Sequence, residues 1–358
     1  MLTPPRALID TSALRHNLAR VRELAPGSRV MAVIKANAYG HGLETAAAAL
    51  ADADGLAVAR LEEALALRAA GSRHRILLLE GVSRVEQLEV AARDNFDVMI
   101  HSVEQLFMLE QRPHGATLRT WIKVDTGMNR LGFRVEEFPG ALARLVRIRG
   151  IAPDPTIVTH LASADEVADP KTQQQLDAFE AATAGAPGER SVANSAAILA
   201  WPASRGGWVR PGLMLYGVSP FPAGTGADIG LRPVMTFQSE VIAVKTVEAG
   251  ETVGYGGAWR AARRTSMAVV AVGYGDGYPR SARAGTPLLI DGQRAPLIGR
   301  VSMDMITADV TGIPAVRVGA PVELWGGLLP LEEVARSADR IPYELTCGVT
   351  QRAPRVVR

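Results

Sequence analysis

The chain contains a single cysteine, Cys347, among its 358 residues. One thiol excludes a disulfide framework within the chain and any metal site built from several cysteines. It also favours a reducing compartment, where proteins carry few structural disulfides.

Strong charge and long apolar runs are also lacking. The formal net charge is +2, with lysine and arginine scattered along the chain, so neither nucleic acid nor an anionic membrane surface is indicated as a partner. No stretch approaches ~18 uninterrupted apolar residues, the length of a membrane-spanning helix. The opening MLTPPRALID lacks the basic-then-apolar pattern of a secretion signal. Together these absences predict a cytoplasmic protein.

Several common catalytic signatures are missing as well. The HExxH, Walker A and GxSxG motifs do not occur in the sequence. His41 and His160 are too sparse to indicate a metal site, and an isolated histidine is more often a structural hydrogen-bonding group.

The first two-thirds of the chain instead repeat one pattern. A short apolar run is followed by a polar turn and a helical stretch such as LEEALALRAA or RVEQLEVAAR. Strands alternating with helices indicate parallel βαβ units, and eight of them predict a TIM-type (β/α)8 barrel over residues 1–230. A doubly wound open sheet is the alternative. The eight apolar runs are Val30–Ile34, Gly55–Ala59, Arg75–Leu79, Phe96–Ile100, Arg119–Val124, Thr156–Thr159, Ser191–Ala193 and Trp208–Val209.

The pattern changes after Gly230 to short β-type runs separated by glycine and proline. Asp291–Gly292 is a hairpin signal, and helical spacing returns only at Leu331–Ser337. We therefore expect a second, mostly-β domain over residues 231–358. The strand-like run RALID precedes the barrel, and pairing of the first ten or so residues with the second domain is one arrangement that this pattern allows.

Polar residues end five of the predicted barrel strands. Because barrel enzymes place their chemistry at the carboxyl ends of the strands, these side chains are expected at one rim. They are Lys35, Lys123 and Asp125 with Arg130 beyond them, His160, Asn194 and Ser195, and Arg210.

The same rim offers a phosphate site beside a lysine. Barrels often bind phosphate with the loops after strands seven and eight, which here supply the Ser195 hydroxyl and the backbone amides of Gly212 and Leu213. A partly desolvated lysine such as Lys35 becomes nucleophilic. A Schiff-base lysine beside a phosphate site is what a pyridoxal phosphate (PLP) enzyme needs. A class I aldolase also uses a barrel lysine, but nothing requires that lysine to lie on strand one.

At this point the motifs resemble a known family. AVIKANAYGHG, which contains Lys35, is similar to the PLP-attachment signature of alanine racemases. Further family motifs follow in the family's order over essentially the whole chain: KVDTGMNRLGF, THLASAD, NSAA, VRPGLMLYG, VGYGGAW, VAVGYGDGYPR, GRVSMDM and IPYE. The resemblance implies a PLP-binding barrel followed by a β domain. It also implies a head-to-tail homodimer in which the partner's second domain completes each active site.

The resemblance implies two catalytic bases. Racemisation removes the α-proton of an amino acid and returns a proton on the opposite face, so a base must lie on each side. Lys35 matches one base as well as the Schiff-base residue, and Tyr255 matches the other, supplied by the partner subunit. An ordinary tyrosine, with a pKa of ~10, is a poor base at neutral pH and needs nearby positive charge. His160 and Arg210 match the residues that form a hydrogen-bonded chain towards it.

Arg210 also matches the arginine that contacts the pyridine nitrogen of PLP. Because arginine does not readily give up a proton, the ring nitrogen stays unprotonated and PLP becomes a weaker electron sink. Such a ring favours return of the proton over transamination.

The other family positions concern the cofactor, the substrate and the access channel. Arg130 matches a residue near the PLP phenolic oxygen and the substrate carboxylate. Lys123 matches a lysine that is carbamylated in many members, although a plain lysine in a salt-bridge network fits it too. Ser302 departs from the family, since many relatives have cysteine there. The remaining matches are Tyr39, Ser195, Gly212, Leu213 and Tyr343 for the phosphate, Met303 and Asp304 for the substrate, and Tyr274, Arg280 and Tyr343 for the access channel.

The resulting hypothesis is an alanine racemase that interconverts L- and D-alanine, either supplying D-alanine for peptidoglycan or acting in alanine catabolism. Three alternatives stay open: a broader-specificity amino-acid racemase, a PLP-dependent decarboxylase of similar fold and a non-catalytic PLP carrier. A decarboxylase is expected to place a carboxylate where Arg210 stands. The carriers lack a second domain and a counterpart of Tyr255.

Overall fold

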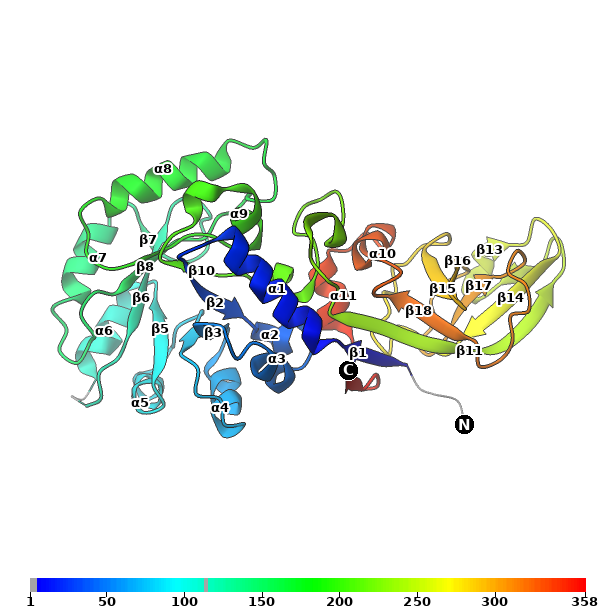
Figure 1. The fold of residues 1–358 in the computed structure, drawn as a ribbon, viewed down its shortest axis with the longest axis horizontal. Coiled ribbons are helices and arrows are strands. Elements are labelled where there is room, and N and C mark those ends of the chain that lie inside the picture. The colour runs from blue at the N-terminus through cyan, green and yellow to red at the C-terminus, as the bar shows by residue number, and fades with distance from the viewer. Residues whose placement is uncertain (1–4, 113–114) are drawn as a thin grey trace.

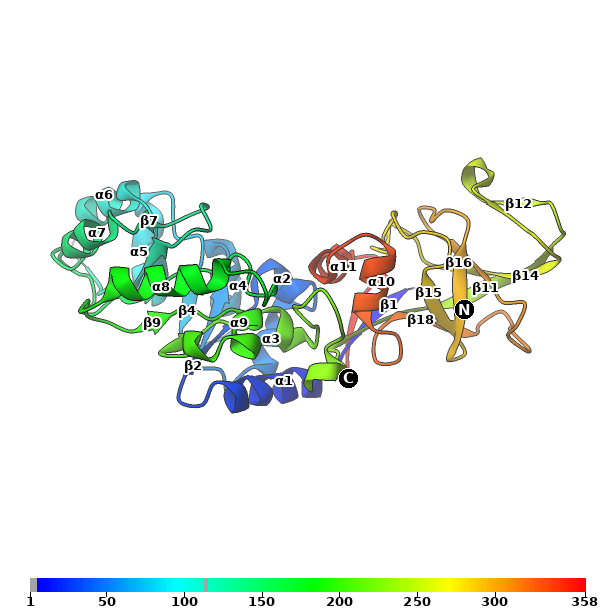
Figure 2. The same cartoon turned by 90° about the horizontal axis from the view of Figure 1, so that it is seen from above.

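The computed structural model describes residues 5–112 and 115–358. A parallel barrel and a mostly-β domain lie side by side along the long axis of the molecule, with the helices α10 (Leu331–Ser337) and α11 (Pro342–Gly348) between them (Figures 1 and 2). Among the described residues, no helix is long and apolar enough to cross a membrane.

Eight parallel strands form the barrel, and pairing of β5 with β6 closes it. Nearly every residue of these strands is buried, because one face lines the barrel interior and the other packs against helices. This explains their continuous apolar runs. The strands are β2 (Arg29–Val33), β3 (Gly55–Val58), β4 (Ile76–Leu78), β5 (Phe96–Ile100), β6 (Thr120–Asp125), β8 (Thr156–Val158), β9 (Arg190–Ser191) and β10 (Trp208–Val209).

Helices follow the strands as the sequence pattern predicts. The helices of this half are α1 (Thr11–Leu24), α2 (Lys35–Tyr39), α3 (Leu43–Ala49), α4 (Leu61–Ala69), α5 (Val85–Arg93), α6 (Val103–Gln111), α7 (Phe138–Leu145), α8 (Lys171–Thr183) and α9 (Ser195–Ala200). Shorter elements are the strand β7 (Phe133–Arg134) and the 3-10 helices η1 (Pro202–Ser204), η2 (Leu213–Tyr216) and η3 (Ala227–Ile229). The predicted (β/α)8 barrel is confirmed, and the open-sheet alternative is wrong. The pattern did not predict β7, whose two residues are too few to show a period.

The second half of the chain forms most of an eight-stranded sheet, a separate two-stranded sheet and two helices. Pairing of β11 with β14 closes six strands of the larger sheet into a ring, and Asp291–Gly292 forms the predicted turn between β15 and β16. The elements are β11 (Met235–Val247), β12 (Thr252–Val253), η4 (Tyr255–Gly257), β13 (Trp259–Arg260), β14 (Thr265–Val270), β15 (Pro287–Ile290), β16 (Gln293–Ile298), β17 (Ile306–Asp309), β18 (Pro321–Trp325), α10 (Leu331–Ser337), α11 (Pro342–Gly348) and β19 (Arg355–Val357).

The N-terminal strand β1 (Arg6–Ile9) belongs to this second sheet. It pairs antiparallel with β11 and parallel with β19. The chain therefore begins in the β domain, passes through the barrel and returns. We propose that the division between the domains falls near residue 230, in the segment between η3 and β11.

Candidate active site

A cleft of about 1010 Å³ lies at the carboxyl-end rim of the barrel. Eleven of the residues singled out from the sequence line it together. Ten come from the barrel half of the chain, whereas Tyr343 comes from α11 of the β domain. The eleven are Lys35, Tyr39, Lys123, Arg130, His160, Asn194, Ser195, Arg210, Gly212, Leu213 and Tyr343.

Lys35 begins a turn of unusual handedness. Ala36, Asn37, Ala38 and Tyr39 all have φ between 52° and 55°, the left-handed helical region. This region costs an L-residue roughly 1–2 kcal/mol, and several in succession are rare. Strain of this kind persists only where the surroundings hold it. The turn brings Lys35 and Tyr39 to the same cleft.

Tyr39 packs closely against the start of η2. A Cβ added at Gly212 would lie 2.5 Å from the Tyr39 hydroxyl oxygen, so only glycine allows this approach. The Tyr39 ring lies 4.7 Å from that of Tyr216 and 5.7 Å from that of Tyr343. Burial raises the pKa of Tyr39, so its hydroxyl keeps its proton and can donate a hydrogen bond.

Ser195 connects the loops after β9 and β10. Its Oγ accepts hydrogen bonds from the backbone N–H groups of Gly212, at 2.9 Å, and Met214, at 3.3 Å. The hydroxyl hydrogen of Ser195 remains available to a ligand oxygen. The hydroxyls of Ser195 and Tyr39 are thus two potential donors beside Gly212, whose own N–H is bonded to Ser195.

Arg210 is buried at the centre of a hydrogen-bond network. It donates to the Ser191 hydroxyl and the Thr159 carbonyl oxygen, both at 2.6 Å. Its Nη2 also lies 3.4 Å from His160 Nδ1. Burial lowers the pKa of Arg210 to about 10, so the guanidinium remains charged at neutral pH. The contact with His160 Nδ1 requires that nitrogen to accept.

His160 is accordingly neutral. Burial, together with the positive charges of Arg210, Lys123 and Arg130, holds the pKa of His160 well below its usual value. With Nδ1 accepting from Arg210, the single ring proton lies on Nε2.

Lys123 is a second buried basic residue of the rim, beside Arg210. Burial and the charges of Arg210 and Arg130 lower the pKa of Lys123 to about 8. No carboxylate lies within 4.0 Å of its amine in the described part of the chain. The salt-bridge network that the sequence allowed is therefore not seen around this lysine.

Five further predicted residues lie on the β domain, away from the cleft. Tyr255 is 69% exposed in η4, between β12 and β13, and these two strands lie beyond α10 and α11 as seen from the barrel (Figures 1 and 2). The Tyr274 N–H donates to the Ser302 carbonyl, next to Met303, while Asp304 pairs with Arg352 at 2.7 Å. None of Tyr255, Tyr274, Arg280, Met303 and Asp304 lines the cleft of its own chain.

Comparison with known proteins accounts for this two-part arrangement. The model of the alanine racemase N-terminal domain matches residues 9–220, and that of the alanine racemase C-terminal domain matches residues 234–357. The chain belongs to the alanine racemase family.

Relatives of the alanine racemase family match the chain from end to end. An alanine racemase from Nitrosococcus oceani is 52% identical over 354 residues, and the match covers 99% of both chains. The solved structure of biosynthetic alanine racemase from Pseudomonas aeruginosa has a TM-score of 0.97 at 44% identity and covers 100% of both chains. The alanine racemase structure from Acinetobacter baumannii has a TM-score of 0.95 at 40% identity and equal coverage.

Sequence reasoning missed some polar residues of this alanine racemase site. His101 lines the cleft directly after β5, and the strand-end rule that found His160 would have found it. Asp165 and Glu332 also line the cleft. Neither follows a strand directly, so no comparable signal marks them.

Proposed function

We propose that this chain interconverts L- and D-alanine with PLP held at the barrel rim. The observation that carries the proposal is the one cleft in which Lys35, the hydroxyls of Tyr39 and Ser195 beside Gly212, and the buried Arg210 converge. Membership of the alanine racemase family supports the same reaction.

The residues of the rim fit an anionic cofactor. Lys35, Arg130 and Arg210 all disfavour the charged form of Lys123, which indicates an excess of positive charge in the cleft. A phosphate dianion would offset that excess. Tyr39, Ser195, Gly212, Leu213 and Tyr343 would hold the phosphate, Lys35 would hold the aldehyde carbon, and Arg210 would face the ring nitrogen.

Bound at this rim, PLP supplies a ring that accepts part of the electron pair left when the α-proton of alanine departs. Arg210 keeps its proton because it is hydrogen-bonded to two oxygens at 2.6 Å and charged at neutral pH. Arg210 would therefore give no proton to the ring nitrogen, and the ring would draw the electron pair away from the α-carbon only weakly. An electron pair that stays largely on the α-carbon favours prompt return of a proton to that carbon.

The proton transfers require one base on each face of the substrate. We propose Lys35 as the base on one face and Tyr255 as the base on the other. Because Tyr255 is exposed and does not line the cleft of its own chain, we propose that it reaches the cleft of a second copy of the chain. The head-to-tail homodimer that we propose would also bring Met303 and Asp304 to the substrate carboxylate beside Arg130. Tyr274 and Arg280 would then border the access channel.

We propose that Lys123 carries a carbamate when CO2 is present. A pKa of about 8 leaves far more neutral amine at pH 7 than an ordinary lysine has. The neutral amine adds to CO2 and releases one proton, which gives an anion able to orient Arg130. With [13C]bicarbonate, NMR of the wild type should show a carbamate resonance, and Lys123→Met should remove it.

The direct test uses the purified full chain with PLP. Incubation with L-alanine and with D-alanine should lead to the same equimolar mixture, measured by chiral chromatography, without release of CO2. Borohydride reduction followed by peptide mapping should attach the cofactor to Lys35. Release of CO2 would support a decarboxylase instead, and absence of a bound chromophore would overturn the proposal.

A further inference from the structure

The left-handed turn after Lys35 is held at its amino end by a carboxylate from another element. Glu63 Oε1, from α4, accepts from the backbone N–H groups of Ala36, at 2.7 Å, and Asn37, at 3.4 Å. Its Oε2 accepts from the N–H groups of Ala59, at 2.9 Å, and Arg60, at 3.3 Å. One carboxylate thus ties the end of β3 to the start of the turn.

A buried imidazole holds the other end of the turn. His41 Nδ1 lies 2.9 Å from the Ala38 carbonyl oxygen and 3.0 Å from that of Tyr39. Both partners are acceptors, so Nδ1 must carry the proton. Burial lowers the pKa of His41 to about 4, which keeps the ring neutral and leaves Nε2 without a hydrogen. The ring stacks on Tyr216, with centroids 4.5 Å apart.

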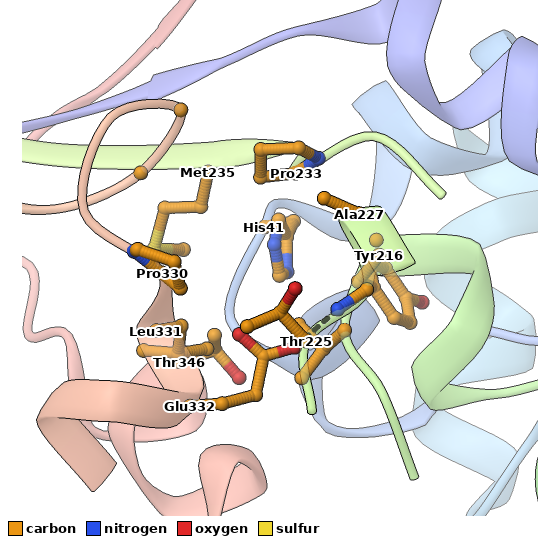
Figure 3. Close-up of a pocket in the computed structure, with 15 residues that line it drawn as sticks. His41, Tyr216, Thr225, Ala227, Pro233, Met235, Pro330, Leu331, Glu332 and Thr346 are labelled. Carbon is orange, nitrogen blue, oxygen red and sulfur yellow. Dashed lines mark hydrogen bonds between the residues drawn. The ribbon is translucent and has the colours of Figure 1, made fainter. Parts of the chain in front are cut away.

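The other ring nitrogen of His41 faces a small cavity between the two domains. His41 Nε2 is buried and has no partner in the described part of the chain. The cavity, about 60 Å³ in volume, is bordered by Thr225, Glu332 and Thr346 as well as His41 (Figure 3). Since a water occupies ≈ 30 Å³ in the liquid, there is room for a donor to Nε2 without movement of the ring.

We infer that Glu63 and His41 are positioning residues that hold the left-handed turn, and through it Lys35 and Tyr39, in the geometry that binds the cofactor. Neither is proposed to touch the cofactor, so the inference rests on the proposed function only for the identity of the ligand. The physical reason is that four consecutive left-handed residues are unfavourable unless their end groups find partners. Glu63 supplies acceptors at the amino end, and His41 supplies a donor at the carboxyl end.

The first test compares Glu63→Ala with its neighbour Glu62→Ala, an exposed carboxylate of the same helix. PLP affinity is measured by equilibrium dialysis, and circular dichroism in the cofactor absorption band reports its orientation. We expect Glu63→Ala to raise the dissociation constant of PLP about tenfold or more and to change the dichroism, because the two backbone donors of the turn lose their acceptor. Glu62→Ala should change neither.

A rescue variant separates a positioning role from general destabilisation. Ala36→Gly relieves the strain at φ 55° because glycine adopts this conformation freely. In the Glu63→Ala background, Ala36→Gly should recover several-fold in PLP affinity, whereas in the wild type it should change affinity little. Absence of rescue, or a PLP affinity of Glu63→Ala equal to that of the wild type, would overturn the role of Glu63.

The second test replaces His41 in two ways. His41→Phe keeps a ring to stack on Tyr216 but removes the Nδ1–H donor, whereas His41→Asn keeps a donor near the Nδ1 position and loses the ring. If the donor holds the turn, PLP binds His41→Asn several-fold more tightly than His41→Phe. The opposite order would show that His41 acts by packing alone and would overturn its assigned role.

These outcomes are distinct from failure of the proposed function. A wild-type protein that does not bind PLP contradicts the proposed function itself. Wild-type binding with unchanged affinity in Glu63→Ala and in both His41 variants contradicts only the present inference.

Discussion

At the scale of single residues, the site is governed by charges that the fold keeps close together. Burial, together with the positive charges of Arg210, Lys123 and Arg130, lowers the pKa of His160 and keeps its ring neutral. A neutral imidazole accepts a hydrogen bond from Arg210 at Nδ1 and can donate another from Nε2, and it does not take a proton away from a neighbouring base. The residues of the rim are thus matched to an anionic ligand.

Lys123 gives a pH-dependent prediction for the cofactor-free protein. Its pKa of about 8 in the folded state lies below the ordinary 10.5 of lysine, so at pH 7 the buried charge opposes folding. This destabilisation decreases as the pH rises from about 8 to 10.5, where the folded chain has lost the Lys123 proton but the unfolded chain still holds it. It is absent above pH 10.5, where the lysine is neutral in both states. Lys123→Met should therefore raise the free energy of unfolding at pH 7 by up to about 3 kcal/mol, and the gain should shrink at pH 10.5.

Urea unfolding in CO2-free buffer at the two pH values measures this effect. Lys245→Met, at an exposed position of β11, is the control and should change stability little at either pH. A Lys123→Met variant less stable than the wild type at pH 7 would contradict the expected sign.

Tyr255 gives a prediction on the direction of proton transfer. Removing the hydroxyl in Tyr255→Phe should lower kcat/KM for racemisation at least about 100-fold, the usual contribution of a general acid–base. One enantiomer of alanine should still exchange its α-proton with deuterated solvent, because Lys35 remains. Tyr278→Phe is the matched control, since the Tyr278 hydroxyl is buried in the same domain without a hydrogen-bond partner among the described residues. Full activity of Tyr255→Phe in both directions would eliminate the two-base assignment.

At the scale of elements, the contact between α2 and α11 fixes the lysine turn against the β domain. Gly40, which ends the turn with φ 84°, leaves no room for a side chain, because a Cβ would overlap the Thr346 carbonyl oxygen. Arg355 Nε donates to the Gly40 carbonyl at 3.0 Å, and Arg355 Nη2 donates to that of Val349 at 2.6 Å. The C-terminal segment therefore holds the end of the turn.

Gly40→Ala tests this contact. Backbone strain and overlap with backbone atoms together should lower the free energy of unfolding by about 3–5 kcal/mol. Gly27 is the matched control, because its φ is 79° and nothing lies within 4 Å of an added Cβ. Gly27→Ala should lose only about 1 kcal/mol. Equal losses in the two variants, measured by urea unfolding, would show that the α2–α11 contact is not tight.

At the scale of the whole molecule, the two proposed bases lie in different domains of one chain. Lys35 lines the cleft at the barrel rim, whereas Tyr255 is in η4 of the β domain, and α10 and α11 lie between the barrel and that domain (Figure 1). A site that needs both can form only between copies arranged head to tail, and a two-fold dimer then contains two such sites.

Mixing two inactive variants tests the shared site. Lys35→Ala and Tyr255→Phe homodimers should each be nearly inactive. After subunit exchange, half of the dimers should be mixed, and each mixed dimer should have one intact site and one doubly altered site. Recovery of about a quarter of wild-type activity is therefore expected. No recovery, with exchange verified by mass spectrometry of differently tagged subunits, would contradict the shared site.

The sequence by itself determined the barrel and most of the rim. Continuous apolar runs such as Phe96–Ile100 are buried on both faces, so each marks a parallel strand without knowledge of its neighbours. The residue that follows such a strand is bound to lie at the rim, which is why Lys35, His160 and Arg210 were found. Local rules sufficed because strand ends in a parallel barrel all meet at one face.

The tertiary structure alone decided how the groups at the rim act on one another. The charge state of Lys123 depends on burial and on Arg210, which is remote in sequence. The left-handed turn depends on Glu63 and His41, neither of which carries a local signal for that role. Hydrogen bonds and electrostatic fields act through space between segments that the chain order does not relate. They could therefore be identified only once the fold had brought those segments together.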